Sequence, residues 1–186
     1  MVSRRRHGHR VPPRGDRPSL YRDGVLIAER SALGGKGFGV LPGAADYRLV
    51  VETARGAPAT LSARNSAAWT FRSEHAEDDH PLPVSVVRFS PALDARNTAP
   101  SGETYRLPVR VERQRGSTAG EVRDLTVEVS FDDGATWSPA PIRKGRVTVN
   151  HPAGEGFVSL RAKAADTAGN TVEQTVIRTY RIALRH

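Results

Sequence analysis

The stretch Leu125–Trp137, with the sequence LTVEVSFDDGATW, decides the fold of this chain. In its first seven residues apolar and polar side chains alternate, and this period of two places on one face of a strand the side chains of Leu125, Val127, Val129 and Phe131. Asp133-Gly134 follows directly, and such a pair after an alternating run is a strong β-hairpin signal because glycine reaches positive φ without steric cost. We therefore expect a strand, a tight turn and a returning strand.

The same stretch contains an Asp-box. The pattern S-x-D-x-G-x-T-W is matched at every defined position by Ser130, Asp132, Gly134, Thr136 and Trp137. An aspartate can accept hydrogen bonds from amides of its own turn, and a tryptophan ring can pack back over the hairpin. Boxes of this kind resemble those of sialidases, which carry several of them away from the active site and add an arginine triad and a tyrosine nucleophile on a longer chain. We therefore interpret this single box as structural.

Further strands are expected between residues 81 and 184. Alternating or β-branched runs lie at 84–89, 105–111, 146–150, 158–164 and 171–182, and the turn before the last run contains Asp166, Gly169 and Asn170. Short strands at these intervals predict an antiparallel β-sandwich of roughly 100 residues. Pro108 cannot donate to a ladder, so its strand is expected at a sheet edge or with the proline at a free position.

Residues 19–73 predict a first, smaller β module. Its strands flank Asp23-Gly24 and include Asp46–Glu52, and Trp69 and Phe71 lie on one face near its end. About 55 residues bury little surface, so we expect this module to be truncated at its N-terminal side. The predicted fold class is therefore all-β, with two tandem antiparallel modules.

Residues 74–80 interrupt the strand pattern and are interpreted as a linker between the modules. They contain two histidines and several carboxylates, which suit divalent metal ions, and the candidate ligands are His75, Glu77, Asp78, Asp79 and His80. No second ligand cluster supports a metal, and surface loops commonly collect such residues. A metal site remains the weaker alternative.

Composition and charge limit the function classes. The 186 residues include no cysteine, so disulfides and thiolate metal sites are excluded, and no apolar run approaches the roughly 20 residues of a membrane-spanning helix. No signal peptide is visible. The formal charge of +8 is concentrated in residues 1–18, an Arg-rich tail expected to be disordered. This tail could bind polyanions in a salt-dependent way, but no specific nucleic-acid partner and no membrane partner are expected.

The sequence offers no catalytic set. A serine nucleophile needs a neighbouring base and an orienting carboxylate, and no Gly-x-Ser-x-Gly motif or comparable arrangement occurs. We therefore expect that the chain is not an enzyme and has no cofactor.

Five phrases of the sequence, in this order, carry a family resemblance. They are Leu20–Gly24, Ala45–Leu49, Ala68–Ser73, Leu125–Trp137 and Gly156–Arg178. Together they resemble the C-terminal, non-catalytic region of large secreted subtilisin-like serine peptidases of GC-rich bacteria, over roughly residues 19 to 183. The turn Asp166–Asn170 also occurs in many bacterial Ig-like and fibronectin-III-like modules.

The resemblance implies an extracellular accessory region that binds or spaces. In such peptidases the catalytic domain lies upstream and β-sandwiches follow it, so the implied partner is a peptidase domain, and the chain is expected to be a fragment that lacks it. No catalytic residue is carried over. The alternative is a free-standing Ig-like module that binds surface glycans or proteins through exposed aromatic rings, for which the candidates are Tyr21, Tyr105 and Tyr180.

Overall fold

The computed structural model describes residues 18–29, 40–75 and 80–184. Within these ranges the chain forms thirteen β-strands and no helix, which confirms the all-β class. The basic tail and the acidic part of the predicted linker, Glu77–Asp79, lie outside the described residues. The strands are β1 Ser19–Arg22, β2 Val25–Glu29, β3 Ala45–Ala54, β4 Arg64–Ser73, β5 Ser85–Phe89, β6 Thr98–Pro100, β7 Thr104–Arg113, β8 Val122–Ser130, β9 Ser138–Pro139, β10 Ile142–Arg143, β11 Arg146–Asn150, β12 Gly156–Asp166 and β13 Thr171–Ala183.

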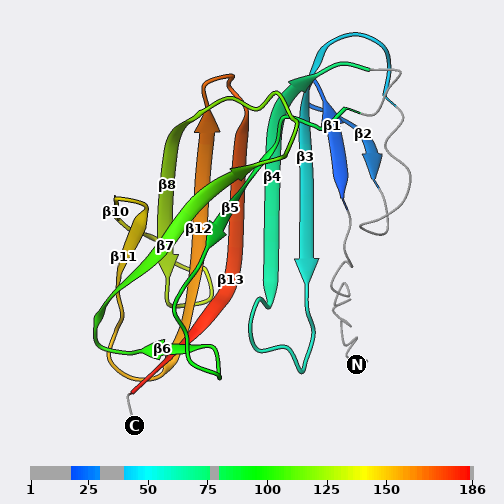
Figure 1. Cartoon of the computed structure of the whole chain (residues 1–186). Coiled ribbons are helices and arrows are strands. Elements are labelled where there is room, and N and C mark those ends of the chain that lie inside the picture. The colour runs from blue at the N-terminus through cyan, green and yellow to red at the C-terminus, as the bar shows by residue number, and fades with distance from the viewer. Residues whose placement is uncertain (1–17, 30–39, 76–79, 185–186) are drawn as a thin grey trace, which may run out of the picture.

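The strands form two sheets. The large sheet has nine strands in the order β2-β1-β3-β4-β13-β12-β8-β9, and β6 pairs in parallel with the C-terminal end of β13. The small sheet has four strands in the order β10-β11-β7-β5. Figure 1 shows β5 and β7 crossing in front of β8, β12 and β13, so the small sheet covers only one half of the large one.

The main core lies between the two sheets. Alternation along β8 and β12 directs Val127, Val129, Leu160 and Ala162 inward, where all four are buried. They belong to one buried cluster, hereafter the sandwich core, with residues of the small sheet that include Leu107, Val147 and Val149. Apolar burial between two layers is the principal stabilising contribution to this half of the molecule.

Strands β1–β4, hereafter the extension, continue the large sheet beyond the sandwich. β4 pairs with β13 in an antiparallel register that runs from Thr171 opposite Thr70 to Ile177 opposite Arg64. A second, smaller buried cluster is formed by Leu20, Ala45, Tyr47 and Phe71. Residues 19–73, predicted as a module, thus share one sheet with the sandwich; the division into two modules stays a prediction.

Two side chains connect the parts. Trp69 of β4 packs against both buried clusters, and its indole N–H donates to the Ser85 carbonyl at 2.7 Å. The Gln174 amide of β13 bridges to the backbone of Val87 in β5, accepting from the Val87 N–H at 3.3 Å and donating to its carbonyl at 3.0 Å. This amide mimics a peptide unit and therefore closes the edge between the two sheets.

One detail differs from the sequence predictions, and the structure decides between the two alternatives for Pro108. Phe131 does not share the inward face of β8: the strand ends at Ser130, and Phe131 is 39% exposed, because the chain turns there into the Asp-box loop. The strand that contains Pro108 is not at an edge, since β7 lies between β11 and β5. Pro108 is opposite Arg146, the first residue of β11, and its carbonyl accepts from Ser90, just beyond the end of β5. The missing N–H therefore falls where the ladder with β5 has ended.

Candidate functional site

The Asp-box forms the loop between β8 and β9, and its side chains hydrogen-bond to one another. The buried Ser130 hydroxyl donates to the Asp132 carboxylate at 2.7 Å and accepts from the Gly134 N–H at 2.9 Å. Asp132 accepts from the Thr136 N–H at 2.9 Å and from the Thr136 hydroxyl at 2.6 Å. The Trp137 indole N–H donates to the Gly134 carbonyl at 3.0 Å. All five motif residues are therefore brought together.

These hydrogen bonds have an electrostatic consequence. The hydroxyl and amide of Thr136, with the Ser130 hydroxyl, stabilise the charged carboxylate and lower the pKa of Asp132 to about 2. Asp133 and Gly134 have φ of 58° and 86°, so both central residues of the turn lie in the left-handed region, as the Asp-Gly prediction requires. The box is thus a self-contained turn whose aspartate remains ionised over the ordinary pH range.

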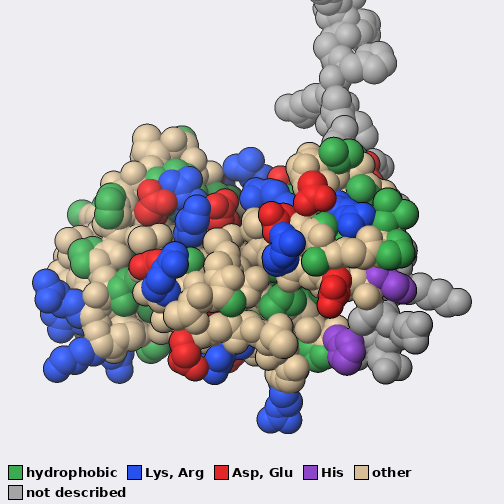
Figure 2. All heavy atoms as spheres, turned by 90° about the horizontal axis from the view of Figure 1, so that it is seen from above, with side chains coloured by type: hydrophobic (Ala, Val, Ile, Leu, Met, Phe, Trp, Pro, Cys, Tyr) green, Lys and Arg blue, Asp and Glu red, His purple; other side chains and the backbone are tan. Residues whose placement is uncertain are grey.

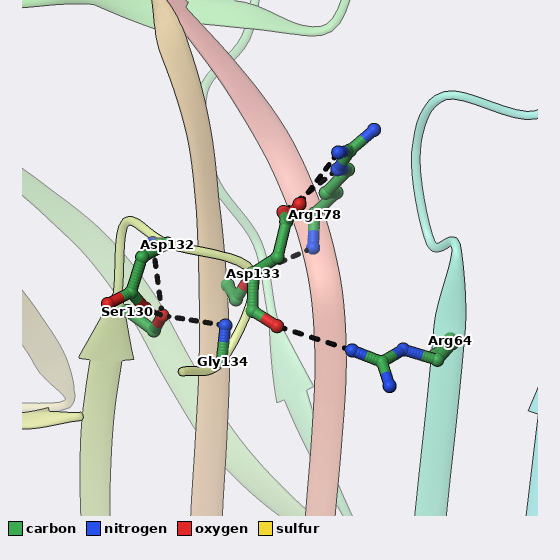
Figure 3. Close-up of polar contacts among 7 residues, drawn as sticks. Arg64, Ser130, Asp132, Asp133, Gly134 and Arg178 are labelled. Carbon is green, nitrogen blue, oxygen red and sulfur yellow. Dashed lines mark hydrogen bonds and ion pairs between the residues drawn. The ribbon is translucent and has the colours of Figure 1, made fainter. Parts of the chain in front are cut away.

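The loop is fixed onto the outer face of the large sheet, the face opposite the sandwich core. Figure 3 shows Asp133 between Arg178 of β13 and Arg64 of β4. The Arg178 guanidinium donates to both carboxylate oxygens of Asp133 at 2.8 and 2.6 Å, and the hydrogen bonds and charge of Arg178 lower the pKa of Asp133. A Cβ on Gly134 would lie 2.8 Å from Ile177 Cδ1 and 3.2 Å from Trp137 Cζ2, and the φ of 86° favours glycine at this position.

A bulge in β13 presents Arg178 to the loop. In the β12–β13 ladder Val158 pairs with Tyr180, whereas Leu160 pairs with Val176. Ser159 is therefore opposite three residues of β13. Arg178 lies in this bulge with φ of 59°, and its N–H donates to the Ser159 hydroxyl at 3.0 Å. β-bulges re-aim side chains in this way. Period-two alternation does not reveal a bulge of this kind.

The second predicted turn motif is also assembled. The buried Asp166 accepts from the N–H groups of Ala168 and Asn170 and from the Asn170 side chain, and it reaches the Gly120 N–H at 2.8 Å. Burial alone would raise the pKa of Asp166, but these hydrogen bonds outweigh it and lower the pKa. Gly169 has φ of 87° in the same turn. This turn and the Asp-box loop are far apart along the strands, since β12 runs between them.

A groove lies on the outer face beside the Asp-box loop. One part, of about 500 Å³, contacts Glu52, Ser66, Trp137, Arg161 and Thr175. A second part, of about 390 Å³, shares Glu52, Ser66, Arg161 and Thr175 with the first and continues along the strands to Lys163 and Glu173. The two parts together are hereafter the outer groove. Clefts of this size are the usual ligand sites of proteins.

The three tyrosines predicted as binding candidates lie elsewhere. Tyr21 is half-buried in β1, and Tyr180 is fully buried in the sandwich core. Tyr105 donates its hydroxyl to the Ala92 carbonyl at 2.6 Å and stacks on His151 with 4.9 Å between ring centroids. The aromatic residue that lines the outer groove is Trp137.

A buried histidine was not found from the sequence. His151 is 5% exposed; its Nδ1 lies 2.6 Å from the Pro100 carbonyl and its Nε2 lies 3.0 Å from the Tyr180 hydroxyl. Burial lowers the pKa of His151, partly offset by the hydrogen bond to Pro100 and the charge of Glu103. A single histidine after a strand carries no pattern that reveals such an environment.

The candidate metal ligands are only partly described. His75 and His80 are exposed, and Glu77, Asp78 and Asp79 lie outside the described residues. Among the residues that the structure does describe, no three histidine or carboxylate side chains gather as a metal site would require. In the same parts of the chain, no helix is long and apolar enough to cross a membrane.

Comparison with known proteins found no match, neither to a protein-family model nor to a curated protein sequence.

Proposed function

We propose that this chain is a non-catalytic accessory module of a secreted subtilisin-family serine peptidase, and that it binds or spaces rather than performing chemistry. The observation that carries the proposal is the position, in the fold, of the sequence segments that resemble the C-terminal region of such peptidases. Leu125–Trp137 covers most of β8 and the Asp-box loop, and Gly156–Arg178 covers β12, the Asp166 turn and much of β13. These segments are adjacent in the large sheet and join directly through the Arg178–Asp133 ion pair. These two phrases thus describe one continuous part of the fold.

The strand order supports an Ig-like or fibronectin-III-like classification of residues 81–184. The small sheet, β10-β11-β7-β5, faces the order β9-β8-β12-β13 of the large sheet. In chain order, β5, β7 and β11 correspond to strands A, B and E of an Ig-type sandwich. Strands β8, β12 and β13 correspond to its strands C, F and G. Sandwiches of this kind host many unrelated functions, so the function has to be argued from a site on the surface.

A fusion experiment tests the accessory role. A subtilisin-type peptidase domain would be produced alone and with this chain attached at its C-terminus. We expect equal kcat/KM on a soluble chromogenic tetrapeptide, because the module adds no catalytic group. On insoluble bacterial cell-envelope protein we expect at least a threefold faster release of peptides from the fusion. Equal release by both proteins would contradict the proposal.

A free-standing binding module is the second candidate, and the outer groove is the observation that favours it. The groove is lined by residues of β3, β4, β8, β12 and β13 together with Trp137 of the Asp-box loop. Retention of the isolated chain on purified cell-envelope material, without any peptidase, would support this candidate; equal retention on an inert resin would contradict it.

A further inference from the structure

We infer that the outer groove binds a neutral saccharide chain, with sugar hydroxyls over Ser66 and Thr175 and a sugar ring against Trp137. The inference rests on the proposed binding function and names the class of ligand. The sheet register, the hydrogen-bonding groups and the charge balance of the groove support it.

The sheet register lines up the groove residues across five strands. Glu52 of β3 is opposite Ser66 of β4, and Ser66 is opposite Thr175 of β13. Thr175 is opposite Arg161 of β12, which is opposite Glu128 of β8. Neighbouring strands are about 4.8 Å apart, so this row is about 19 Å long. Short side chains in the middle and long ones at both ends make it a trough.

The side chains of the trough match the hydrogen bonding of a polyol. Ser66 and Thr175 carry hydroxyls that both donate and accept, and neither takes part in a side-chain hydrogen bond among the described residues. Glu52 offers an exposed carboxylate that accepts only, and no ion pair to it is found in the described part of the chain. Each sugar hydroxyl can donate to one such group and accept from another.

Trp137 lines the trough beside Arg161, which covers one face of its ring, and the rest of the ring supplies an apolar surface. Its ring is held by the N–H bond to Gly134, and the Arg161 guanidinium lies over it at 4.6 Å from the ring centroid. Arg161 is in turn paired with Glu128 at 2.7 Å, so its orientation is set from the sheet side. A half-buried aromatic ring beside fixed polar groups is the arrangement that suits a ligand with an apolar ring face and a polar rim.

The charges of the groove balance, which favours a neutral ligand over a polyanion. The cationic lining residues are Arg48, Arg64, Arg161 and Lys163, and the anionic ones are Glu52, Glu128, Asp133 and Glu173. Lys163 pairs with Glu173 at 2.9 Å, which leaves little uncompensated positive charge. Figure 2, seen from above, shows basic and acidic side chains interleaved on that face of the molecule as well. The net charge of the chain therefore does not extend into this site.

The test uses the full chain and a panel of defined probes in isothermal titration calorimetry. The probes are the hexasaccharides of β-1,4-glucose, β-1,4-N-acetylglucosamine and α-1,4-glucose, with heparin as the anionic comparison. We expect at least one neutral probe to bind, with less than a twofold change in affinity between 50 mM and 500 mM NaCl. Binding only to heparin, or to no probe, would overturn the inference.

Variants locate the binding. Thr175→Arg places a long side chain on the trough floor and should weaken binding at least tenfold, and Glu52→Gln should weaken it several-fold. Thr118→Arg, in an exposed loop that does not line the groove, adds the same charge and should change nothing. Thermal melts of the three variants establish that each is folded. Unchanged saccharide affinity of a folded Thr175→Arg protein would overturn the inference.

The two proposals fail in different ways. If no saccharide binds but the peptidase fusion still accelerates release from insoluble envelope protein, the saccharide inference is wrong and the accessory role stands. If a saccharide binds in the groove and the fusion gives no acceleration, the accessory role is wrong and the binding site stands.

Discussion

Strands β4 and β12 both pair with β13, one on each side, yet they are held in different ways. β12 lies beneath the small sheet, and along its length Val158, Leu160 and Ala162 are fully buried in the sandwich core. β4 belongs to the extension, whose own buried cluster has four residues against sixteen in the sandwich core. An open pocket of about 310 Å³ also lies beside Tyr47 and Phe71. A hydrogen-bonded ladder thus extends a sheet, whereas a second layer packed on it stabilises it.

The largest effect is expected in the sandwich core. Leu160→Ala removes a side chain with no exposed surface and leaves a cavity between two sheets that cannot collapse, so the free energy of unfolding should fall by about 3–5 kcal/mol. Urea unfolding followed by far-UV circular dichroism measures the loss. A loss below about 1 kcal/mol would show that the two sheets do not pack as described.

A truncation in the extension should have a smaller and more local effect. Phe71→Ala removes the ring that stacks on Tyr47, and because the neighbouring pocket allows relaxation we expect a loss of about 2–3 kcal/mol. Hydrogen exchange should accelerate in β1, β3 and β4 while β8 and β12 stay protected. Equal acceleration in both sets of strands would indicate that extension and sandwich unfold as one unit.

The Asp-box loop connects the two regions from the outer face, and its loss should be milder still. Ser130→Ala removes the buried hydroxyl that accepts from the Gly134 N–H, which leaves that amide without its partner and should cost about 1–2 kcal/mol. Thermal unfolding measures the loss. Thr118→Ala, in an exposed loop, serves as the control, and equal melting temperatures of the two variants would contradict the described network.

Acid should destabilise the sandwich more than the extension, and this change in stability should be the smallest of the four predicted effects. The folded-state pKa of His151 lies below its ordinary value of 6.5 because the ring is buried, so the unfolded state binds the proton more readily. The contribution of His151 is therefore fully present above pH 6.5 and is lost as the pH falls below it. His151 faces Tyr105 and Tyr180, and the charge of Glu103 acts on it.

The measurement is the urea midpoint at pH 7 and at pH 5. His151→Gln should make the midpoint less dependent on pH over this interval. His75→Gln, at an exposed histidine, serves as the control variant. Loss of the pH dependence of the urea midpoint in His75→Gln, and not in His151→Gln, would contradict the prediction.

The turns were the most predictable part of the fold. Asp23-Gly24 and Asp133-Gly134 both have positive φ in the structure, because the pair of residue types itself favours that backbone conformation. The hydrogen bonds inside the Asp-box are equally local, and so are those of the Asp166 turn apart from the one that Gly120 donates. Phe131 was misplaced because alternation does not indicate where a strand ends, and here the Ser130 hydroxyl and the following amides begin the loop.

The outer groove could not be predicted, because its residues come from strands that are distant in the sequence. Glu52, Thr175 and Arg161 become neighbours only through the registers of β3, β4, β13 and β12. The tyrosines that the sequence suggested for binding lie in or near the cores, and Trp137, considered only as part of the hairpin, lines the groove. Aromatic residue type alone does not reveal which face of a sheet a ring occupies.

The sequence by itself determined the all-β class, the tight turns and the closed hydrogen bonding of Ser130–Trp137, since these depend on period-two alternation and on contacts between near neighbours. Only the tertiary structure decided that β4 continues the sheet of β13, that Gln174 closes the sandwich edge and that Asp133 meets Arg178 at a bulge. These features require strand pairing over long separations. Pairing of that kind is selected by the burial of whole faces, which no local pattern specifies.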